Sequence, residues 1–203
     1  MMEAVFFDFS GVVSSPDREE LSRLERQYGL PDDALLRTLE EIWEWQDLMV
    51  GLGSEETFSE AVFRELDALA GKPIPRTQQV WTTICEQMDE GMLDLARRVR
   101  RRYRVGMISN NSPWFEREIR DFYKIDHLFD VVVNSATLGI AKPDPRVFHH
   151  AARSLDLTPS MCVHIDDRER NVQGAREAGF HAIRYQGHLP SLVSELQRLG
   201  MEW

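Results

Sequence analysis

The chain lacks most features of secreted and membrane-embedded proteins. It has only two cysteines, Cys85 and Cys162, in 203 residues, which is too few for a disulfide scaffold and typical of a reducing compartment. No apolar run approaches the roughly 18 residues of a membrane helix. The apolar stretch Ala4–Phe7 is also shorter than the roughly 7 to 15 residues of a signal-peptide core. We therefore expect a cytoplasmic protein without a membrane partner.

Positive charge is also in deficit. The chain has 24 Lys and Arg residues against 34 Asp and Glu residues, which gives a formal net charge of -10 and repels nucleic acid at long range. Six arginines do lie between Arg97 and Arg104, but Tyr103 is the only aromatic residue among them, whereas nucleic-acid grooves carry several stacking aromatics. We expect these cations to close a helix C-terminus, where they complement the helix dipole, and we expect no nucleic-acid partner.

Short apolar runs alternate with helix-like segments over most of the chain. This alternation predicts an α/β fold with an open, doubly wound parallel sheet. Ser112–Pro113 and Asp144–Pro145 each place a capping side chain before a proline, which predicts a helix beginning at each proline. The predicted strands are Ala4–Phe7, Val105–Ile108, Asp130–Val133, Met161–Ile165 and, more weakly, His181–Tyr185.

About ninety residues separate the first two strands, far more than a single crossover needs. We expect residues 14–89, named here the helical insert, to form a domain of about four amphipathic helices, and residues 1–13 and 90–203 to form the α/β domain. The insert holds 17 acidic and 7 basic side chains, while the rest of the chain holds 17 of each. The apolar stripes that predict the helices are Leu21, Leu24 and Tyr28; Leu35, Leu36, Leu39, Ile42 and Trp43; Phe58, Val62, Phe63, Leu66 and Leu69; and Val80, Ile84 and Met88.

Reactive side chains follow the four main strands. Asp8 comes after the first, Ser109–Asn111 after the second, Lys142–Pro145 after the third, and Asp166–Asp167 after the fourth. Because parallel strands end at one edge of a sheet, we expect these residues to converge. Clustered carboxylates need a cation, and oxygen ligands suit Mg²⁺. The hydroxyl and the lysine need an anion, and a phosphoryl group between Mg²⁺ and Lys142, open to attack by Asp8, meets both needs.

These four elements, in this order, resemble the haloacid dehalogenase superfamily. The segments Ile108–Asn111, Gly139–Asp144 and Ile165–Asp167 are similar to the branch that contains the phosphatase domain of soluble epoxide hydrolases and bacterial sugar-phosphate phosphatases. The resemblance covers nearly the whole chain. It implies a Rossmann-like core, with the helical insert as a cap of the first type.

The resemblance also implies a Mg²⁺-dependent phosphatase that acts on a small organic monophosphate through an aspartyl-phosphate intermediate. The implied roles are nucleophile and metal ligand for Asp8, support of Asp8 and the phosphoryl oxygens for Lys142, phosphate binding for Ser109 and Asn110, a backbone carbonyl ligand to the metal from Ser10, and metal ligation by Asp167 with support from Asp166. Nothing in the sequence indicates an oligomeric state.

One position departs from the family pattern. Phosphatases of this family usually carry a second Asp two residues after the nucleophile, as general acid and base, where this chain has Ser10. A hydroxyl does not titrate near neutral pH, and loss of such a group typically costs about 10²- to 10⁴-fold in rate. None of the six histidines lies in the helical insert, which excludes an imidazole acid from there. We expect His164 to be a satisfied strand residue.

Several functions therefore stay open. The first is a phosphatase, which is slow and favours good leaving groups unless a different group replaces the missing acid, and the second is a phosphate-binding or interaction module without turnover. The others are a metal-free haloacid dehalogenase, which has no use for the Asp166–Asp167 pair, and phosphonate cleavage, which needs a lysine such as Lys72 from the insert. The acidity of the insert favours a single phosphate on a neutral or cationic organic group.

Overall fold

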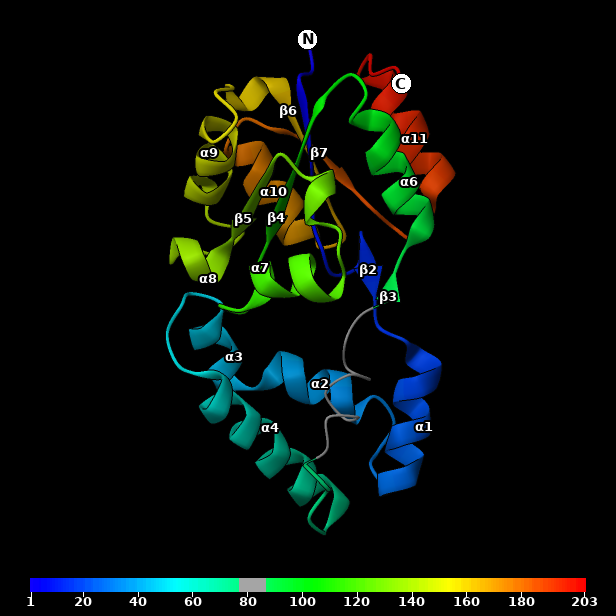
Figure 1. Ribbon diagram of the computed structural model, residues 1–203, viewed down its shortest axis with the longest axis vertical. Coiled ribbons are helices and arrows are strands. Elements are labelled where there is room, and N and C mark those ends of the chain that lie inside the picture. The colour runs from blue at the N-terminus through cyan, green and yellow to red at the C-terminus, as the bar shows by residue number, and fades with distance from the viewer. Residues whose placement is uncertain (77–86) are drawn as a thin grey trace.

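A computed structural model of the chain describes residues 1–76 and 87–203 (Figure 1). Its centre is a parallel five-stranded sheet in the order β5-β4-β1-β6-β7. The predicted α/β fold with an open parallel sheet is therefore confirmed, and each predicted strand is present with its ends shifted by one residue at most. The strands are β1 (Ala4–Phe7), β4 (Arg104–Ser109), β5 (Val131–Asn134), β6 (Cys162–Asp166) and β7 (His181–Arg184).

Helices cover both faces of this sheet. One face packs on α6 (Glu90–Val99) and α11 (Leu189–Arg198), and the other on α9 (Pro145–Arg153) and α10 (Glu169–Glu177). The strand residues alternate between the two faces, so Phe7 joins the cluster under α6 and α11. Because side chains alternate along a strand, the neighbouring Phe6 joins the cluster under α9 and α10.

Short elements connect the strands and helices. They are α7 (Phe115–Arg117), η1 (Glu118–Phe122), η2 (Asp126–Leu128), α8 (Ser135–Leu138) and η3 (Pro159–Met161). Asp144 caps α9 before Pro145, as predicted. The helix predicted to begin at Pro113 begins two residues later, at Phe115, as α7. The Ser112 carbonyl accepts from the Phe115 N–H at 3.2 Å and from the Asn134 side chain at 2.8 Å.

Four helices of the helical insert pack around one apolar cluster that includes Leu24, Leu35, Phe63 and Leu66. The second predicted helix is divided in two, because Ile42 has extended dihedral angles (φ -65°, ψ 126°). The fourth apolar stripe at Val80 and Ile84 lies outside the described residues, as does the Trp43 side chain. The four helices are α1 (Arg18–Tyr28), α2 (Ala34–Glu41), α3 (Trp43–Leu48) and α4 (Glu55–Ala70).

The prediction that Met88 belongs to a helix is wrong. Met88 lies in β3 (Gln87–Met88), which pairs antiparallel with β2 (Ser14–Ser15). The N–H of Asp89 continues this pairing to the Val13 carbonyl at 2.9 Å. The two crossings of the chain between sheet and insert therefore run side by side as a two-stranded ladder.

The helices of the insert lie beyond the carboxyl ends of the sheet strands (Figure 1). Trp114, from the loop after β4, packs against the apolar cluster of the insert. A Cβ atom on Gly51 would come within 2.5 Å of the Ala136 carbonyl oxygen, so the α3–α4 loop lies directly on α8. The insert thus covers the sheet edge at which the reactive residues were predicted to converge.

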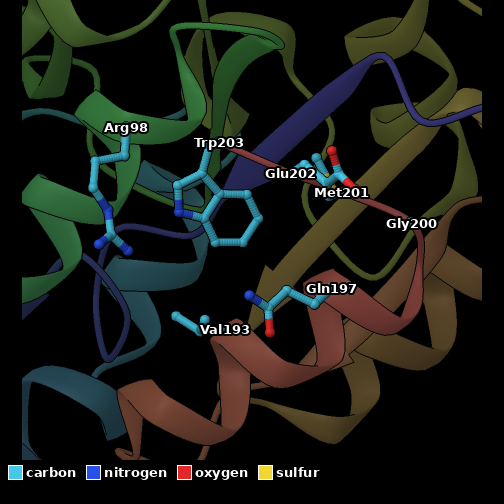
Figure 2. Close-up of a pocket in the computed structure, with 7 residues that line it drawn as sticks. All are labelled: Arg98, Val193, Gln197, Gly200, Met201, Glu202 and Trp203. Atoms are coloured by element: carbon cyan, nitrogen blue, oxygen red, sulfur yellow. The ribbon is translucent and has the colours of Figure 1, made fainter.

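The arginine run begins in the last turn of α6 and continues past its C-terminus, as expected. This helix ends at Val99, and Arg100 pairs with Asp130 at 2.7 Å. Behind it, a cavity of about 490 Å³ lies between α6, α11 and the C-terminal tail, lined by side chains such as Arg98, Gln197 and Trp203 (Figure 2). It contains none of the predicted site residues. Within 1–76 and 87–203, no helix is long and apolar enough to span a membrane.

Candidate active site

The carboxyl edge of the sheet brings the predicted reactive residues together. Asp8 directly follows β1, Ser109 ends β4, and Asp166 ends β6. Lys142 reaches the same place from the loop between α8 and α9. Asp8, Asp166 and Asp167 each offer a carboxylate oxygen, and these oxygens lie within 4.8 Å of one another.

Lys142 is the centre of this cluster and is only 3% exposed. Its ammonium group donates to Asp8 Oδ1 at 2.8 Å, to Asp166 Oδ2 at 2.7 Å and to the Ile108 carbonyl at 2.8 Å. Burial acts to lower the Lys142 pKa, but the two carboxylates outweigh it and raise the pKa above its ordinary value. Lys142 is therefore a fixed cation with all three protons engaged.

Asp8 accepts a second hydrogen bond on Oδ1, from the Phe9 N–H at 2.7 Å. Burial, together with the charge on Asp166, raises the Asp8 pKa to about 8 despite the opposing effect of Lys142. A cation beside Asp8 favours its ionised form. Ionisation of Asp8 at neutral pH thus requires more positive charge than Lys142 supplies.

Asp166 is saturated by donors from the protein. Its Oδ2 accepts from Lys142, from His164 Nε2 at 3.0 Å and from Asn171 Nδ2 at 3.1 Å. Its Oδ1 accepts from the Arg168 N–H at 2.9 Å and from Asn171 at 3.0 Å. Burial favours the neutral form, but Lys142 and then His164 hold the Asp166 pKa well below its usual range. Asp166 is therefore an anchor for Lys142.

Asp167, in contrast to Asp166, has a carboxylate oxygen without a hydrogen-bond donor among the described residues. Its Oδ1 is buried and has no hydrogen-bond partner in the described part of the chain, and burial followed by the charge on Asp166 raises its pKa. Three carboxylates against one ammonium leave two uncompensated negative charges when all are ionised. A hard divalent cation with oxygen ligands compensates that charge and uses the orphaned oxygen. The donor set therefore fits Mg²⁺.

The turn after Asp8 approaches this cluster closely. Ser10 forms an isolated β-bridge with Ser14. Gly11 has a φ of +80°, and a Cβ atom on it would lie only 2.7 Å from the Asp167 carboxylate. Only glycine fits here without strain. Gly11 therefore lies directly against the Asp167 carboxylate, and the backbone carbonyl of Ser10 as a metal ligand stays a prediction.

Ser109 and Asn110 lie at the same edge but differ in what they offer. Ser109 is 2% exposed, and its Oγ accepts from Asn111 Nδ2 at 3.5 Å. The Asn110 side chain is committed to the Lys142 backbone, because Nδ2 donates to its carbonyl at 2.8 Å and Oδ1 accepts from its N–H at 2.7 Å. The Asn110 side chain is therefore already engaged within the protein.

Asn171, a donor to Asp166, was not predicted from the sequence. Asn171 lies five residues after Asp166, near the start of α10, where a helix turn brings it back over the strand end. His164 lies within a strand, as expected, but only half of its hydrogen-bonding capacity is satisfied: Nε2 bonds to Asp166, whereas the buried Nδ1 has no partner in the described part of the chain. Burial lowers the His164 pKa.

Three comparisons with known proteins bear on this site. The family model described as haloacid dehalogenase-like hydrolase matches residues 2–179. D-ribitol-5-phosphate phosphatase of Bacteroides thetaiotaomicron is 26% identical over 196 residues, which covers 91% of this chain and 92% of the relative. Phosphatase MT3486 of Mycobacterium tuberculosis is 30% identical over 195 residues, which covers 89% of this chain and 86% of the relative.

A solved structure shares the fold. A HAD family enzyme of Bacteroides thetaiotaomicron, crystallised as an alanine variant with magnesium and inorganic phosphate, superposes with a TM-score of 0.72. It is 20% identical, and the match covers 95% of this chain and 99% of the other. The similarity therefore extends over both the sheet and the helical insert.

Proposed function

The chain belongs to the family of haloacid dehalogenase-like hydrolases, and we propose that it is a Mg²⁺-dependent phosphatase of small organic monophosphates. The observation that carries the proposal is the cluster of Asp8, Lys142, Asp166 and Asp167, with its excess negative charge and the unpartnered Asp167 Oδ1. The two curated relatives are both named as phosphatases, which supports the reaction class.

In the first step, a carboxylate oxygen of Asp8 attacks phosphorus. A bond forms between Asp8 and phosphorus, and the bond from phosphorus to the organic oxygen breaks with its electron pair leaving on that oxygen, which takes a proton from solvent. In the second step, water attacks the aspartyl phosphate, releases inorganic phosphate and restores the carboxylate. Lys142, 2.8 Å from Asp8 Oδ1, stabilises negative charge in both steps.

Asp8 and Asp167 would hold the metal ion, with the backbone carbonyl of Ser10 as a third ligand. When bound, Mg²⁺ offsets the charge of the carboxylates and of the phosphoryl group, which lets two anions approach each other. Asp166 supports the site by fixing Lys142, since its own oxygens are already saturated.

Ser109 and the backbone N–H of Asn110 bind the phosphoryl oxygens. Both lie at the end of β4, beside the Lys142 loop. The side-chain amide of Asn110 contributes indirectly, because it holds the Lys142 backbone from both sides.

The helical insert, residues 14–89, acts as a cap that selects the organic group. It covers the edge of the sheet that carries Asp8 (Figure 1), and all of the net charge of -10 belongs to it. An acidic cap disfavours polyphosphorylated substrates and favours a neutral or cationic group on a single phosphate. We also place the enzyme in the cytoplasm, in keeping with its two cysteines.

Dehalogenation and phosphonate cleavage fit the site less well. A metal-free dehalogenase has no need for Asp167, whose uncompensated oxygen lies beside Asp8. Phosphonate cleavage needs a lysine near Asp8, but Lys72 is exposed and follows the end of α4, which points away from the sheet (Figure 1).

The test is phosphate release from a panel of monophosphates with and without Mg²⁺. We expect Mg²⁺-dependent release by the wild type, loss of at least about 10³-fold in Asp8→Asn, as expected for removal of a nucleophile, and unchanged release in the surface control Asp121→Asn. Halide release from 2-haloacids, or phosphate binding without turnover, would contradict the proposal in favour of a dehalogenase or a binding module.

A further inference from the structure

His164 lies in an apolar setting where a hydrophobic residue would be expected. It is fully buried in the middle of β6, beside Phe6 of β1 and Ala182 of β7. The edge of its ring contacts Phe148 of α9 at a centroid distance of 5.2 Å. Burying an imidazole there costs free energy unless its nitrogen atoms are hydrogen-bonded.

The ring makes one hydrogen bond that leads directly to the reactive cluster. His164 Nε2 donates to Asp166 Oδ2 at 3.0 Å, and the same oxygen accepts from Lys142 at 2.7 Å. Lys142 in turn contacts Asp8 at 2.8 Å. Nδ1 has no partner among residues 1–76 and 87–203, so the bond to Asp166 is what the ring contributes.

The need for this bond arises during the proposed reaction. Asp8 loses its negative charge when it becomes an acyl phosphate, which weakens its attraction for Lys142. Asp166 is then the carboxylate that keeps the ammonium group in place for the transferred phosphoryl group. Its Oδ1 is held by Arg168 and Asn171, whereas the orientation of Oδ2 toward Lys142 depends on His164 and Asn171.

We propose that His164 is a positioning residue, which orients Asp166 so that Asp166 fixes the Lys142 ammonium group beside Asp8. This inference rests on the proposed phosphatase function for its role in catalysis. The placement of Lys142 that it describes can be measured separately. Because His164 lies outside the predicted metal ligands, its loss acts on turnover and leaves the binding of Mg²⁺ and substrate little changed.

The variants separate hydrogen bonding from packing. His164→Leu and His164→Phe both remove the N–H that donates to Asp166, and Phe keeps an aromatic ring of similar size. His164→Gln keeps an N–H donor at a similar distance from the backbone. Phe148→Leu is the matched control, since it disturbs the ring contact of His164 and leaves the bond to Asp166 in place. Thermal unfolding of all four variants reports on folding.

The kinetic readout uses p-nitrophenyl phosphate with titrated Mg²⁺. For His164→Leu and His164→Phe we expect kcat to fall about 10- to 100-fold, as for other supporting groups around a metal site, with KM and the Mg²⁺ activation constant unchanged. His164→Gln and Phe148→Leu should keep most of the wild-type kcat. An unchanged kcat in both apolar variants, or an equal loss in His164→Gln, would overturn the proposal.

The second readout does not depend on activity. The chain has only three lysines, and Lys72 and Lys124 are exposed, so protein labelled with ¹⁵N-lysine should show one slowly exchanging ammonium signal, from Lys142. We expect this signal to broaden or vanish in the apolar variants and to persist in His164→Gln and Phe148→Leu. A signal that persists in every variant refutes the positioning role. A wild type that releases no phosphate refutes only the phosphatase.

Discussion

At the scale of single residues, Ser10 stands where the proposed reaction would need a proton donor for the leaving group. The described ionisable groups that contact Asp8 include Lys142, whose protons are all engaged and whose pKa is raised. Asp166 is saturated by donors and stays ionised. Neither group is a proton donor for a leaving oxygen, so we expect the leaving group itself to determine the rate of the first step of the proposed reaction.

Ser10→Asp should therefore raise turnover. We expect kcat to increase about 10- to 100-fold for alkyl phosphates, because a carboxyl group here can protonate a poor leaving group, and to change little for p-nitrophenyl phosphate. Steady-state kinetics with a series of substrates that differ in leaving-group pKa measures this gain. We expect kcat to depend less steeply on the leaving-group pKa in the variant than in the wild type.

Ser10→Asn is the control, because it has nearly the same size and cannot act as an acid. Equal gains from Asn and Asp, or no gain from Asp in an active enzyme, would show that another group supplies the proton.

Gly11 gives a second prediction at this scale. Gly11→Ala should destabilise the fold by about 1 kcal/mol through the positive φ and should also weaken Mg²⁺ binding, because the new Cβ displaces Asp167. Gly200→Ala is the matched control, with a φ of +79° and no atom within 4 Å of its Cβ. Isothermal titration with Mg²⁺ and thermal unfolding measure the two effects. Similar Mg²⁺ affinities in the two variants would contradict the close approach.

At the scale of elements, the strands and the helices of the helical insert differ in how well the sequence predicts them. The strands were predictable because short runs such as Ala4–Phe7 are apolar on both faces. Asp8, Ser109, Asp166 and Asp167 were predictable because they lie at or directly after strand ends, whereas Lys142 lies in the loop after α8.

The β2–β3 ladder was not predictable, since it depends on pairing between segments far apart in the sequence. The break at Ile42, an apolar residue buried in the helical insert, and the start of α7 at Phe115 were not predicted either. The two hydrogen bonds from the Asn110 side chain to the Lys142 backbone were not predictable either, because these residues are far apart in the sequence.

Contact between η1 and the insert gives a pH-dependent prediction. Burial, with a further contribution from Glu55 of α4, raises the Glu118 pKa from its ordinary 4.5 to about 7. The folded state therefore holds a proton that the unfolded state has lost, and stability falls as the pH rises from 4.5 to 7. Glu118→Gln should then be more stable than the wild type by about 1 to 3 kcal/mol near pH 8.

Chemical denaturation at several pH values tests this. Near pH 4 the variant and the wild type should have the same free energy of unfolding, since Glu118 is protonated in both states. The exposed Glu60→Gln serves as the control. A gain for Glu118→Gln that does not depend on pH would contradict burial of the carboxyl group as its cause.

At the scale of the whole molecule, the uneven charge gives a prediction about substrates. The helical insert carries a net charge of -10 and the remainder none. We expect kcat/KM to be higher for monophosphates with a cationic group than for those with a second anionic group. For the anionic substrates, kcat/KM should rise between about 0.01 and 0.15 M ionic strength as the repulsion is screened. Nucleoside triphosphates as the best substrates would contradict this.

The most direct measurement of the central claim is the covalent state of Asp8 during turnover. Rapid acid quenching of the wild type with substrate and Mg²⁺, followed by peptide mass spectrometry, should find one hydroxylamine-sensitive phosphoryl group on Asp8. The group should be absent without Mg²⁺ and in Asp8→Asn. Mg²⁺-dependent phosphate release that continues in Asp8→Asn, with no phosphoryl group found on Asp8, would contradict the claim.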